Sequence, residues 1–277
     1  MAQQHSIPLG NVPLSGGERF FLIAGPCVIE SEEHVLRMAL QIQSITQRLD
    51  IPLIFKSSFD KANRTSLHSY RGPGLEKGLA ALRRVKEQTG VPVLTDVHEV
   101  FHVEPAAQVC DVLQIPAFLC RQTDLLLAAG RSGRVVNIKK GQFVSPQEIC
   151  HALEKVRSTG NERVLVTERG TSFGYNNLVV DMRSLPILRS FGCPVVLDIT
   201  HSVQLPGGAG QASGGQPEFI EPLARAGVAV GVDGLFVEVH DNPAAALSDG
   251  ANALPLEQLE RLLERLLQLD RVVRPWL

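Results

Sequence analysis

The length of 277 residues fits two average domains or one large α/β barrel, so length alone permits a single domain. Hydrophobic residues make up 44% of the chain, aromatic residues 5% and charged residues 20%, a balance that excludes intrinsic disorder as the main state. The 27 Lys and Arg residues against 29 Asp and Glu residues leave a formal net charge of −2, so no protein-wide positive field attracts nucleic acid or an anionic membrane.

The start of the chain is rich in residues that interrupt regular structure, namely Pro8, Gly10, Pro13, Gly16 and Gly17. This composition suits an arm or a cap better than a domain. We therefore expect residues 1–19 to form an N-terminal extension that caps the bottom of a barrel, and residues 20–277 to form the barrel itself.

From residue 20 onward, short β-branched apolar runs alternate with longer segments of helical period, which is the pattern of βα units. Eight strands are predicted: Phe20–Ala24, Pro52–Phe55, Pro92–Thr95, Val112–Ile115, Val135–Ile138, Arg163–Val166, Pro194–Leu197 and Gly234–Val237. Intervening helices carry apolar stripes, namely Val35, Ala39, Ile42, Ile45 and Leu49 after an N-cap at Ser31, then Leu75, Leu79, Leu82 and Val85, and finally Leu256, Leu259, Leu263, Leu266 and Leu267.

Eight such units predict an α/β fold with a single (β/α)8 TIM barrel. A doubly wound open sheet is the alternative, but the turn Gly25-Pro26-Cys27 after the first strand lacks the G-x-G-x-x-G spacing of a dinucleotide-binding crossover. The segment Leu205–Pro217 holds five glycines and is either a plain flexible loop or a mobile lid over the site.

The expected compartment is the cytoplasm. No apolar run approaches the roughly 18 to 20 residues of a membrane-spanning helix, and residues 1–17 show no apolar core of a signal peptide. The five cysteines are odd in number and widely spaced, which favours free thiols in a reducing environment.

Polar residues follow nearly every predicted strand, at the end where barrel enzymes build their sites. In chain order they are Cys27, Lys56, Ser57, Asp96, His98, Gln114, Lys139, Lys140, Glu168, Arg169, Asp198, His201, Glu238 and His240. Cations gather on the same loops, namely Lys56, Lys61, Arg64, Arg121, Lys139 and Arg169. They are either solvated surface charges or a site for dianionic phosphate ligands, to which guanidinium groups bind bidentately.

Cys27, His201, Glu238 and Asp249 come from the first, seventh and eighth units, which become neighbours when a barrel closes. A thiolate, an imidazole and two carboxylates suit a borderline divalent transition ion such as zinc, iron or manganese. The alternative for Cys27 is an ordinary small buried thiol, and no C-x-x-C or H-E-x-x-H spacing supports the metal hypothesis by itself.

Six sequence strings together resemble the 3-deoxy-D-manno-octulosonate 8-phosphate (KDO 8-phosphate) synthase family, from about residue 20 to the C-terminus. They are AGPCVIES (24–31), FKSSFDKANRTS (55–66), TDVHE (95–99), IKKGQF (138–143), TERG (167–170) and DITHSVQLPGG (198–208). The resemblance implies a barrel transferase, usually a homotetramer, that condenses phosphoenolpyruvate with D-arabinose 5-phosphate and water. The product feeds lipopolysaccharide synthesis.

The resemblance also implies roles for individual residues. Lys61, Lys139 and Arg169 match residues that hold phosphoenolpyruvate, with Lys56 and Gln114 at the same end of the site. The sugar phosphate would be held by Asn63, Arg64, Thr65 and Ser66, and by Arg121 reaching in from a neighbouring subunit. The expected catalytic residues are Lys61, Asn63, Asp96 and His201.

Family members with Asn in place of Cys27 work without a metal, and members with Cys are metal-dependent. Cys27 places this chain with the second group, whose other three ligands match His201, Glu238 and Asp249. The implied cofactor is a divalent transition metal: zinc, iron, manganese or cobalt.

Two other functions compete with this interpretation. The related 3-deoxy-D-arabino-heptulosonate 7-phosphate synthase uses erythrose 4-phosphate on a similar barrel, but it reads KPRTS where this chain reads KANRTS, and the extra Asn63 favours the longer pentose. A catalytically inactive barrel used as a binding module would have lost ligands or cations, and none is missing.

Overall fold

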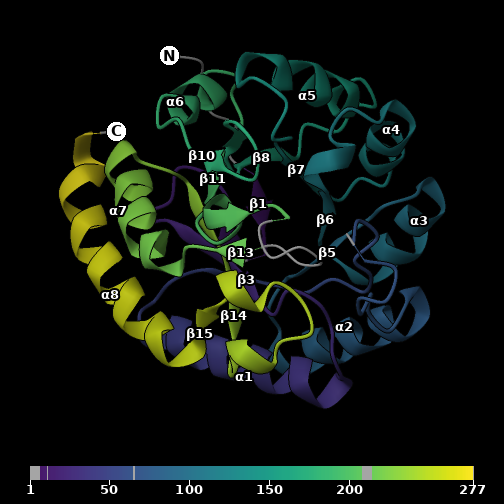
Figure 1. Ribbon diagram of the computed structural model, residues 1–277. Coiled ribbons are helices and arrows are strands. Elements are labelled where there is room, and N and C mark those ends of the chain that lie inside the picture. Colours follow the sequence, from purple (N-terminus) through teal and green to yellow (C-terminus); the bar gives the residue numbers. More distant parts are fainter. Residues whose placement is uncertain (1–6, 11, 65, 208–213, 277) are drawn as a thin grey trace.

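The computed structural model describes residues 7–10, 12–64, 66–207 and 214–276. It confirms the predicted single (β/α)8 barrel (Figure 1). The barrel consists of β3 (Phe21–Gly25), β4 (Leu53–Lys56), β5 (Val93–Asp96), β6 (Val112–Ile115), β7 (Val135–Lys139), β8 (Val164–Glu168), β11 (Val195–Asp198) and β14 (Gly234–His240). Each strand is parallel to its neighbours, and the pairing of β14 with both β11 and β3 closes the barrel.

Eight α-helices surround the strands. They are α1 (Glu32–Arg48), α2 (Leu75–Thr89), α3 (Val100–Val109), α4 (Thr123–Arg131), α5 (Cys150–Arg157), α6 (Ser184–Arg189), α7 (Ile220–Val230) and α8 (Leu256–Val273). Short 3-10 helices are η1 (Ala117–Leu119), η2 (Gln147–Ile149), η3 (His201–Val203), η4 (Pro217–Phe219), η5 (Pro243–Ala245), η6 (Gly250–Asn252) and η7 (Arg274–Trp276). Short strands on the loops are β9 (Thr171–Ser172), β10 (Leu178–Val179), β12 (Gln204–Leu205), β13 (Gly214–Gly215) and β15 (Leu254–Pro255).

Alternation along each strand divides the core into two layers. In β3, Leu22 and Ala24 pack outward against the helices, whereas Phe21 and Ile23 belong to an inner cluster that fills the barrel. The predicted helix stripes supply the outer layer, although Leu49, Leu75 and Leu256 at helix ends are only partly buried. Ser31 caps α1 as predicted, because its hydroxyl accepts a hydrogen bond from the His34 amide at 3.0 Å.

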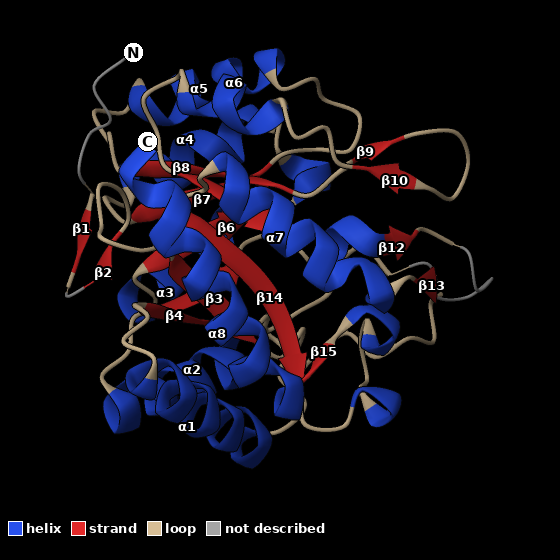
Figure 2. Ribbon diagram, turned by 90° about the vertical axis from the view of Figure 1, so that its left-hand side faces the viewer, coloured by secondary structure: helices blue, strands red, loops and turns tan. Residues whose placement is uncertain are grey.

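A small hairpin of β1 (Pro8–Leu9) and β2 (Val12–Pro13) lies at the opposite end of the barrel from β12 and β13 (Figure 2). Its apolar side chains join the inner cluster of the barrel and so exclude water from the N-terminal ends of the strands: Ile7, Leu9, Val12 and Leu14. Residues 1–6 and 11 lie outside the described part of the chain, and the boundary between extension and barrel at residues 19 and 20 stays a prediction.

The glycine-rich segment 205–217 begins in β12, includes β13, which pairs antiparallel with β12, and ends at the start of η4. Residues 208–213 lie outside the described residues, so the choice between loop and lid stays open. Among the described helices, none is both long enough and apolar enough to cross a bilayer.

Removing the side chain of Leu14 tests how much the N-terminal hairpin stabilises the barrel. Leu14 is fully buried among the inward-facing strand residues. We expect Leu14→Ala to lower the free energy of unfolding by about 2–5 kcal/mol, measured by denaturant titration, because it leaves a cavity. Leu40→Ala on the exposed face of α1 is the control and should change it by less than about 0.5 kcal/mol. Equal free energies of unfolding for the two variants would show that Leu14 does not stabilise the barrel.

Candidate active site

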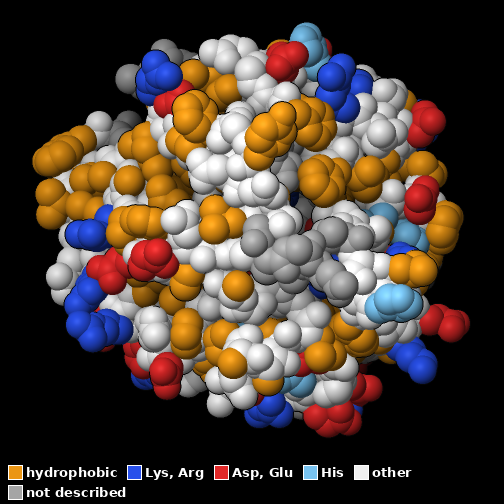
Figure 3. Space-filling view, in the orientation of Figure 1, with side chains coloured by type: hydrophobic (Ala, Val, Ile, Leu, Met, Phe, Trp, Pro, Cys, Tyr) orange, Lys and Arg blue, Asp and Glu red, His pale blue; other side chains and the backbone are white. Residues whose placement is uncertain are grey.

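A cavity of about 900 Å³ opens at the C-terminal ends of the barrel strands. It is lined by predicted site residues from several units: Lys56, Lys61, Asn63, Arg64, Asp96, Gln114, Lys139, Arg169, His201 and Asp249. Figure 3 shows this face of the molecule, where the visible charged side chains lie mainly at the periphery. Within the cavity itself, the charged side chains of Lys56, Lys139 and Arg169 are buried.

The four predicted metal ligands converge at one side of the cavity. Ligand atoms of Cys27, Glu238 and Asp249 all lie within 4.8 Å of one another, and His201 Nε2 is 3.3 Å from Glu238 Oε1. Cys27 follows β3 directly, Glu238 lies in β14, His201 begins η3 after β11, and Asp249 precedes η6. Closure of the barrel thus brings together residues that the sequence separates by more than 200 positions.

The protonation states of this cluster depend on whether a cation is present. Burial raises the pKa of the Cys27 thiol, and the charges of Glu238 and Asp249 act in the same direction. Burial also opposes ionisation of Glu238, but His201, Lys61 and Lys56 outweigh it and lower the pKa of that carboxyl. The protein alone therefore holds a neutral thiol beside two carboxylates.

The thiol has two polar contacts, and Arg64 holds one of the two contacting residues. Cys27 Sγ lies 2.7 Å from Ser248 Oγ and 3.2 Å from Asp249 Oδ2, and Arg64 donates to the Ser248 hydroxyl. Glu238 Oε2 is fully buried and has no hydrogen-bond partner among the described residues. An unsatisfied buried carboxylate oxygen next to a thiol and an imidazole is what a divalent cation would complete, so the donor set fits a transition metal.

The lysines of the cavity are buried next to carboxylates. Lys56 donates to the Cys27 carbonyl at 3.0 Å, and its Nζ lies 3.4 Å from Glu238 Oε1 and 3.7 Å from Asp96 Oδ2. Lys61 Nζ lies 3.8 Å from the same Glu238 oxygen. Each ammonium group is thereby neutralised in part before any ligand binds.

On the other side of the cavity, Lys139 donates to Asp198 and lies over the Phe236 ring, 3.5 Å from its centroid. Burial lowers the pKa of Lys139, and the Asp198 carboxylate opposes that shift. Asp198 also accepts a hydrogen bond from His201 Nδ1 at 2.7 Å. This bond orients the imidazole so that Nε2 faces Glu238.

Arg169 is the cation best prepared for an anion. It is 4% exposed, and Nη2 donates to Gln204 Oε1 at 2.8 Å. Its Nη1 is buried without a hydrogen-bond partner among the described residues. Burial lowers the pKa of this guanidinium, with Asp198 and Glu168 opposing the shift. A bound phosphate or carboxylate would satisfy both the charge and the free N–H groups.

A chain of hydrogen bonds crosses four strands beneath the cavity. Thr167 donates to Asn137 at 2.8 Å, Asn137 to Gln114 at 2.8 Å, and Gln114 to Asp96 Oδ1 at 2.5 Å. Ser58 donates to the other oxygen of Asp96. Burial opposes ionisation of Asp96, but Lys56, Lys61, His98 and the Ser58 hydroxyl together lower its pKa, so Asp96 is an ionised acceptor.

Sequence reasoning missed several residues of the site. Asn137, Thr167 and Ser248 were not predicted, although Asn137 and Thr167 could have been noticed as single polar residues inside the apolar runs VVNIK and VLVTE. Lys140 and Glu168, which follow predicted strands, face each other at 3.5 Å and tie the loops after β7 and β8 together.

Three predicted sugar-phosphate residues lie away from the cavity or outside the described residues. The exposed Arg121 does not line it, and its backbone carbonyl accepts from Lys155 Nζ at 3.0 Å. Ser66 does not line it either, and its hydroxyl accepts from the His68 amide at 3.3 Å. Thr65 lies outside the described residues. Their roles stay predictions.

Comparison with known proteins connects this site to a family. The chain matches the DAHP synthetase I family over residues 4–274. It is 60% identical over 269 residues to a protein of Syntrophotalea carbinolica, with 97% of each chain covered. It is 60% identical over 268 residues to a Trichlorobacter lovleyi protein, with 97% of this chain and 98% of the relative covered. A Geotalea uraniireducens protein is 59% identical over 268 residues, with the same coverage.

All three relatives are named 2-dehydro-3-deoxyphosphooctonate aldolase, another name for KDO 8-phosphate synthase. The resemblance inferred from the sequence strings is therefore confirmed, and this chain belongs to the KDO 8-phosphate synthase family.

Proposed function

We propose that the protein condenses phosphoenolpyruvate with D-arabinose 5-phosphate and water to give 3-deoxy-D-manno-octulosonate 8-phosphate and phosphate. The names of the relatives support this reaction over the heptulosonate alternative. The observation that carries it is the buried Arg169 with its unpaired Nη1, which lines one cavity together with lysines and with His201 and Asp249 of the four-residue cluster. A cavity built in this way can bind an anionic substrate and a divalent cation side by side.

In this reaction, C3 of phosphoenolpyruvate forms a bond to the aldehyde carbon, whose oxygen takes up a proton. Water adds at C2 and gives up a proton. The bond from C2 to the phosphate oxygen then breaks, the C2 hydroxyl loses its proton to become the ketone, and phosphate leaves with that proton. Lys61, Lys139 and Arg169 would bind phosphoenolpyruvate, with Lys56 and Gln114 beside them. Preorganised cations stabilise the developing charge, so no covalent nucleophile is needed.

The sugar phosphate would lie toward Asn63 and Arg64, which line the same cavity. Arg64 is held there by its bonds to the Tyr70 carbonyl, at 3.2 Å, and to Ser248. Thr65 and Ser66 would complete this end of the site. The ionised Asp96 would accept a hydrogen bond from a reacting hydroxyl group.

Cys27, His201, Glu238 and Asp249 would hold a divalent transition metal, namely zinc, iron, manganese or cobalt. When bound, such an ion polarises a carbonyl oxygen or lowers the pKa of a water molecule. The chain's own contribution is the orientation of the ligands, since Asp198 fixes the His201 ring and Lys56 lies against Glu238.

We further propose a cytoplasmic homotetramer that supplies a lipopolysaccharide precursor. The support for an oligomer comes from Arg121, whose exposed position outside its own chain's cavity suits a side chain that serves a neighbouring subunit.

The first test of this function is the choice of sugar. We expect kcat/KM for arabinose 5-phosphate to exceed that for erythrose 4-phosphate by at least about 100-fold, because a polar pocket left unfilled costs several kcal/mol. Phosphate release from phosphoenolpyruvate with each sugar measures the ratio. Asn63→Ala should lower this ratio of the two kcat/KM values. Equal turnover of the two sugars would refute the proposed substrate.

Arg121→Ala tests the shared site. Losing one charge-assisted pair to phosphate removes roughly 1.5–3 kcal/mol, so KM for arabinose 5-phosphate should rise about tenfold or more, with little change for phosphoenolpyruvate. Oligomers mixed from Arg121→Ala and a separately inactivated Arg169→Ala chain should regain activity, because some sites then receive both intact residues. No recovery in the mixture would show that Arg121 does not act across subunits.

Cys27 variants test the metal. We expect a chelator to abolish activity and added zinc, iron, manganese or cobalt to restore it to differing extents. Cys27→Ala should lose bound metal and activity without unfolding, as measured by metal analysis and circular dichroism. Cys27→Asn should keep partial activity that resists chelators, since family members with Asn need no metal. Full activity of rigorously metal-stripped wild-type protein would show that the reaction does not require a bound metal.

A further inference from the structure

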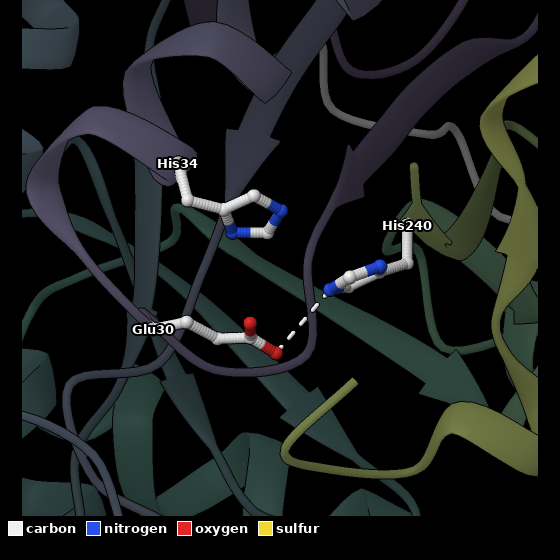
Figure 4. A group of neighbouring side chains, drawn as sticks. All are labelled: Glu30, His34 and His240. Carbon is white, nitrogen blue, oxygen red and sulfur yellow. Dashed lines mark hydrogen bonds and ion pairs between the residues drawn. The ribbon is translucent and has the colours of Figure 1, made fainter. Parts of the chain in front are cut away.

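A second group of polar side chains lies on the segments that carry the thiol–carboxylate cluster and on the neighbouring helix α1: Glu30, His34 and His240 (Figure 4). His34 and His240 are buried, and none of the three lines the active-site cavity. They therefore do not touch a substrate bound in that cavity, and their role must be exerted through the residues that they hold.

Glu30 joins three segments of the chain through one carboxylate oxygen. Its Oε1 accepts a hydrogen bond from the Leu247 amide at 2.8 Å and lies 3.2 Å from His240 Nε2. Glu30 itself follows Cys27 by three residues, His240 follows Glu238 by two, and Leu247 precedes Asp249 by two. The contact thus ties together the segments that carry three of the four proposed ligands.

The hydrogen-bond partners of the His240 ring show which of its two nitrogens donates to Glu30. The Asn242 amide donates to His240 Nδ1 at 2.9 Å, so Nδ1 is the acceptor nitrogen and the ring proton resides on Nε2. His240 Nε2 is thereby left to donate to Glu30 Oε1, and the dashed line in Figure 4 joins these two atoms. Both nitrogens of the His240 ring are therefore engaged in hydrogen bonds, and Glu30 and His240 form a clamp between their segments.

Helix α1 anchors the other side of this clamp. The His34 ring packs on the His240 ring with centroids 4.8 Å apart, and His34 Nε2 lies 3.0 Å from Asp241 Oδ1. Arg37 donates to the other oxygen of Asp241 at 2.7 Å. The start of the loop after β14 is therefore fixed to the first turns of α1.

The loop that the clamp holds carries an unfavourable backbone conformation. Asp249 has φ of +50°, in the left-handed region that non-glycine residues seldom adopt. A side chain on the next residue, Gly250, would collide with the Pro243 carbonyl oxygen, so this turn is tightly folded. Such a turn persists only where surrounding contacts maintain it.

We propose that Glu30 is a positioning residue whose carboxylate sets the separation of Cys27 and Asp249, and thereby the affinity of the four-ligand cluster for its metal. The inference rests on the proposed function, in which that cluster holds a divalent ion. Outer residues that orient ligands in this way typically change metal affinity by about 10- to 100-fold when they are removed.

The experiment compares metal-free wild-type protein with Glu30→Ala, Glu30→Gln and Glu32→Ala. Zinc affinity is measured by competition with a chromogenic chelator, and coordination is followed by the absorption of the cobalt form. Glu30→Ala should bind zinc about 10- to 100-fold more weakly and show an altered cobalt spectrum. Glu30→Gln keeps an acceptor oxygen and should recover most of the affinity. Glu32→Ala, which removes an exposed carboxylate paired with Arg84, should match the wild type.

A second variant tests the same contact from its other side, so that the result does not depend on the folding of one variant. His240→Asn removes the donor to Glu30 and should weaken zinc binding in the same direction, with circular dichroism melting showing that each metal-free variant folds. Unchanged zinc affinity and an unchanged cobalt spectrum in folded Glu30→Ala or His240→Asn would overturn the proposal. Two metal ions per wild-type chain, one of them lost in His34→Ala, would also overturn it.

Failure of the proposed function gives a different result. If the cobalt form of the wild-type protein shows no thiolate–cobalt absorption, the proposed metal site is refuted, and this inference is refuted with it. Wild-type protein with that absorption, together with an unaffected Glu30→Ala variant, would remove only the role of Glu30.

Discussion

Mutual neutralisation of buried charges at the C-terminal mouth of the barrel is the constraint on which the site depends. An isolated charge in a protein interior costs several kcal/mol, and breaking a buried pair leaves that cost uncompensated. Lys56 is 1% exposed, yet it touches both Glu238 and Asp96, and Lys139 is paired with Asp198. Charges of both signs therefore lie together around the closed ring of strand ends, and each buried charge is partly neutralised by an opposite one.

Nearly all polar atoms of this network have a hydrogen-bond partner within it. The atoms that lack a partner indicate which ligands the site binds. In the part of the chain that the structure describes, two charged groups of the network keep an unpaired buried atom, Arg169 Nη1 and Glu238 Oε2. One is a positive donor and the other a negative acceptor. Unpaired buried polar atoms are rare and costly, so this pair of exceptions favours an anion at one side of the cavity and a cation at the other.

The fold could be predicted from the sequence because βα alternation is a local pattern. The polar residues at the strand ends could then be predicted from the fold, because all parallel strands of a barrel end at the same face. Contacts between loops were not predictable in this way. Cys27 and Asp249 are separated by 222 positions, and the sequence grouped them only through barrel closure and the family resemblance, with no local spacing to support the pair. Ser248 and the Glu30–His240 contact depend on how the β14–η6 loop folds back, for which the sequence carries no periodic signal. The placement of Arg121 likewise depends on a neighbouring subunit, which no pattern within one chain describes.

The four proposed metal ligands differ in how firmly the scaffold holds them. Glu238 lies in β14, Cys27 follows β3 directly, and His201 is fixed by Asp198, so each is positioned by the barrel itself. Asp249 lies nine residues beyond the end of β14, in a left-handed turn that the barrel does not support. A site on a loop is less precise than a site on a strand unless neighbouring groups restrain it. The hydrogen bond from the Leu247 amide to Glu30 supplies that restraint at the point where the barrel no longer does.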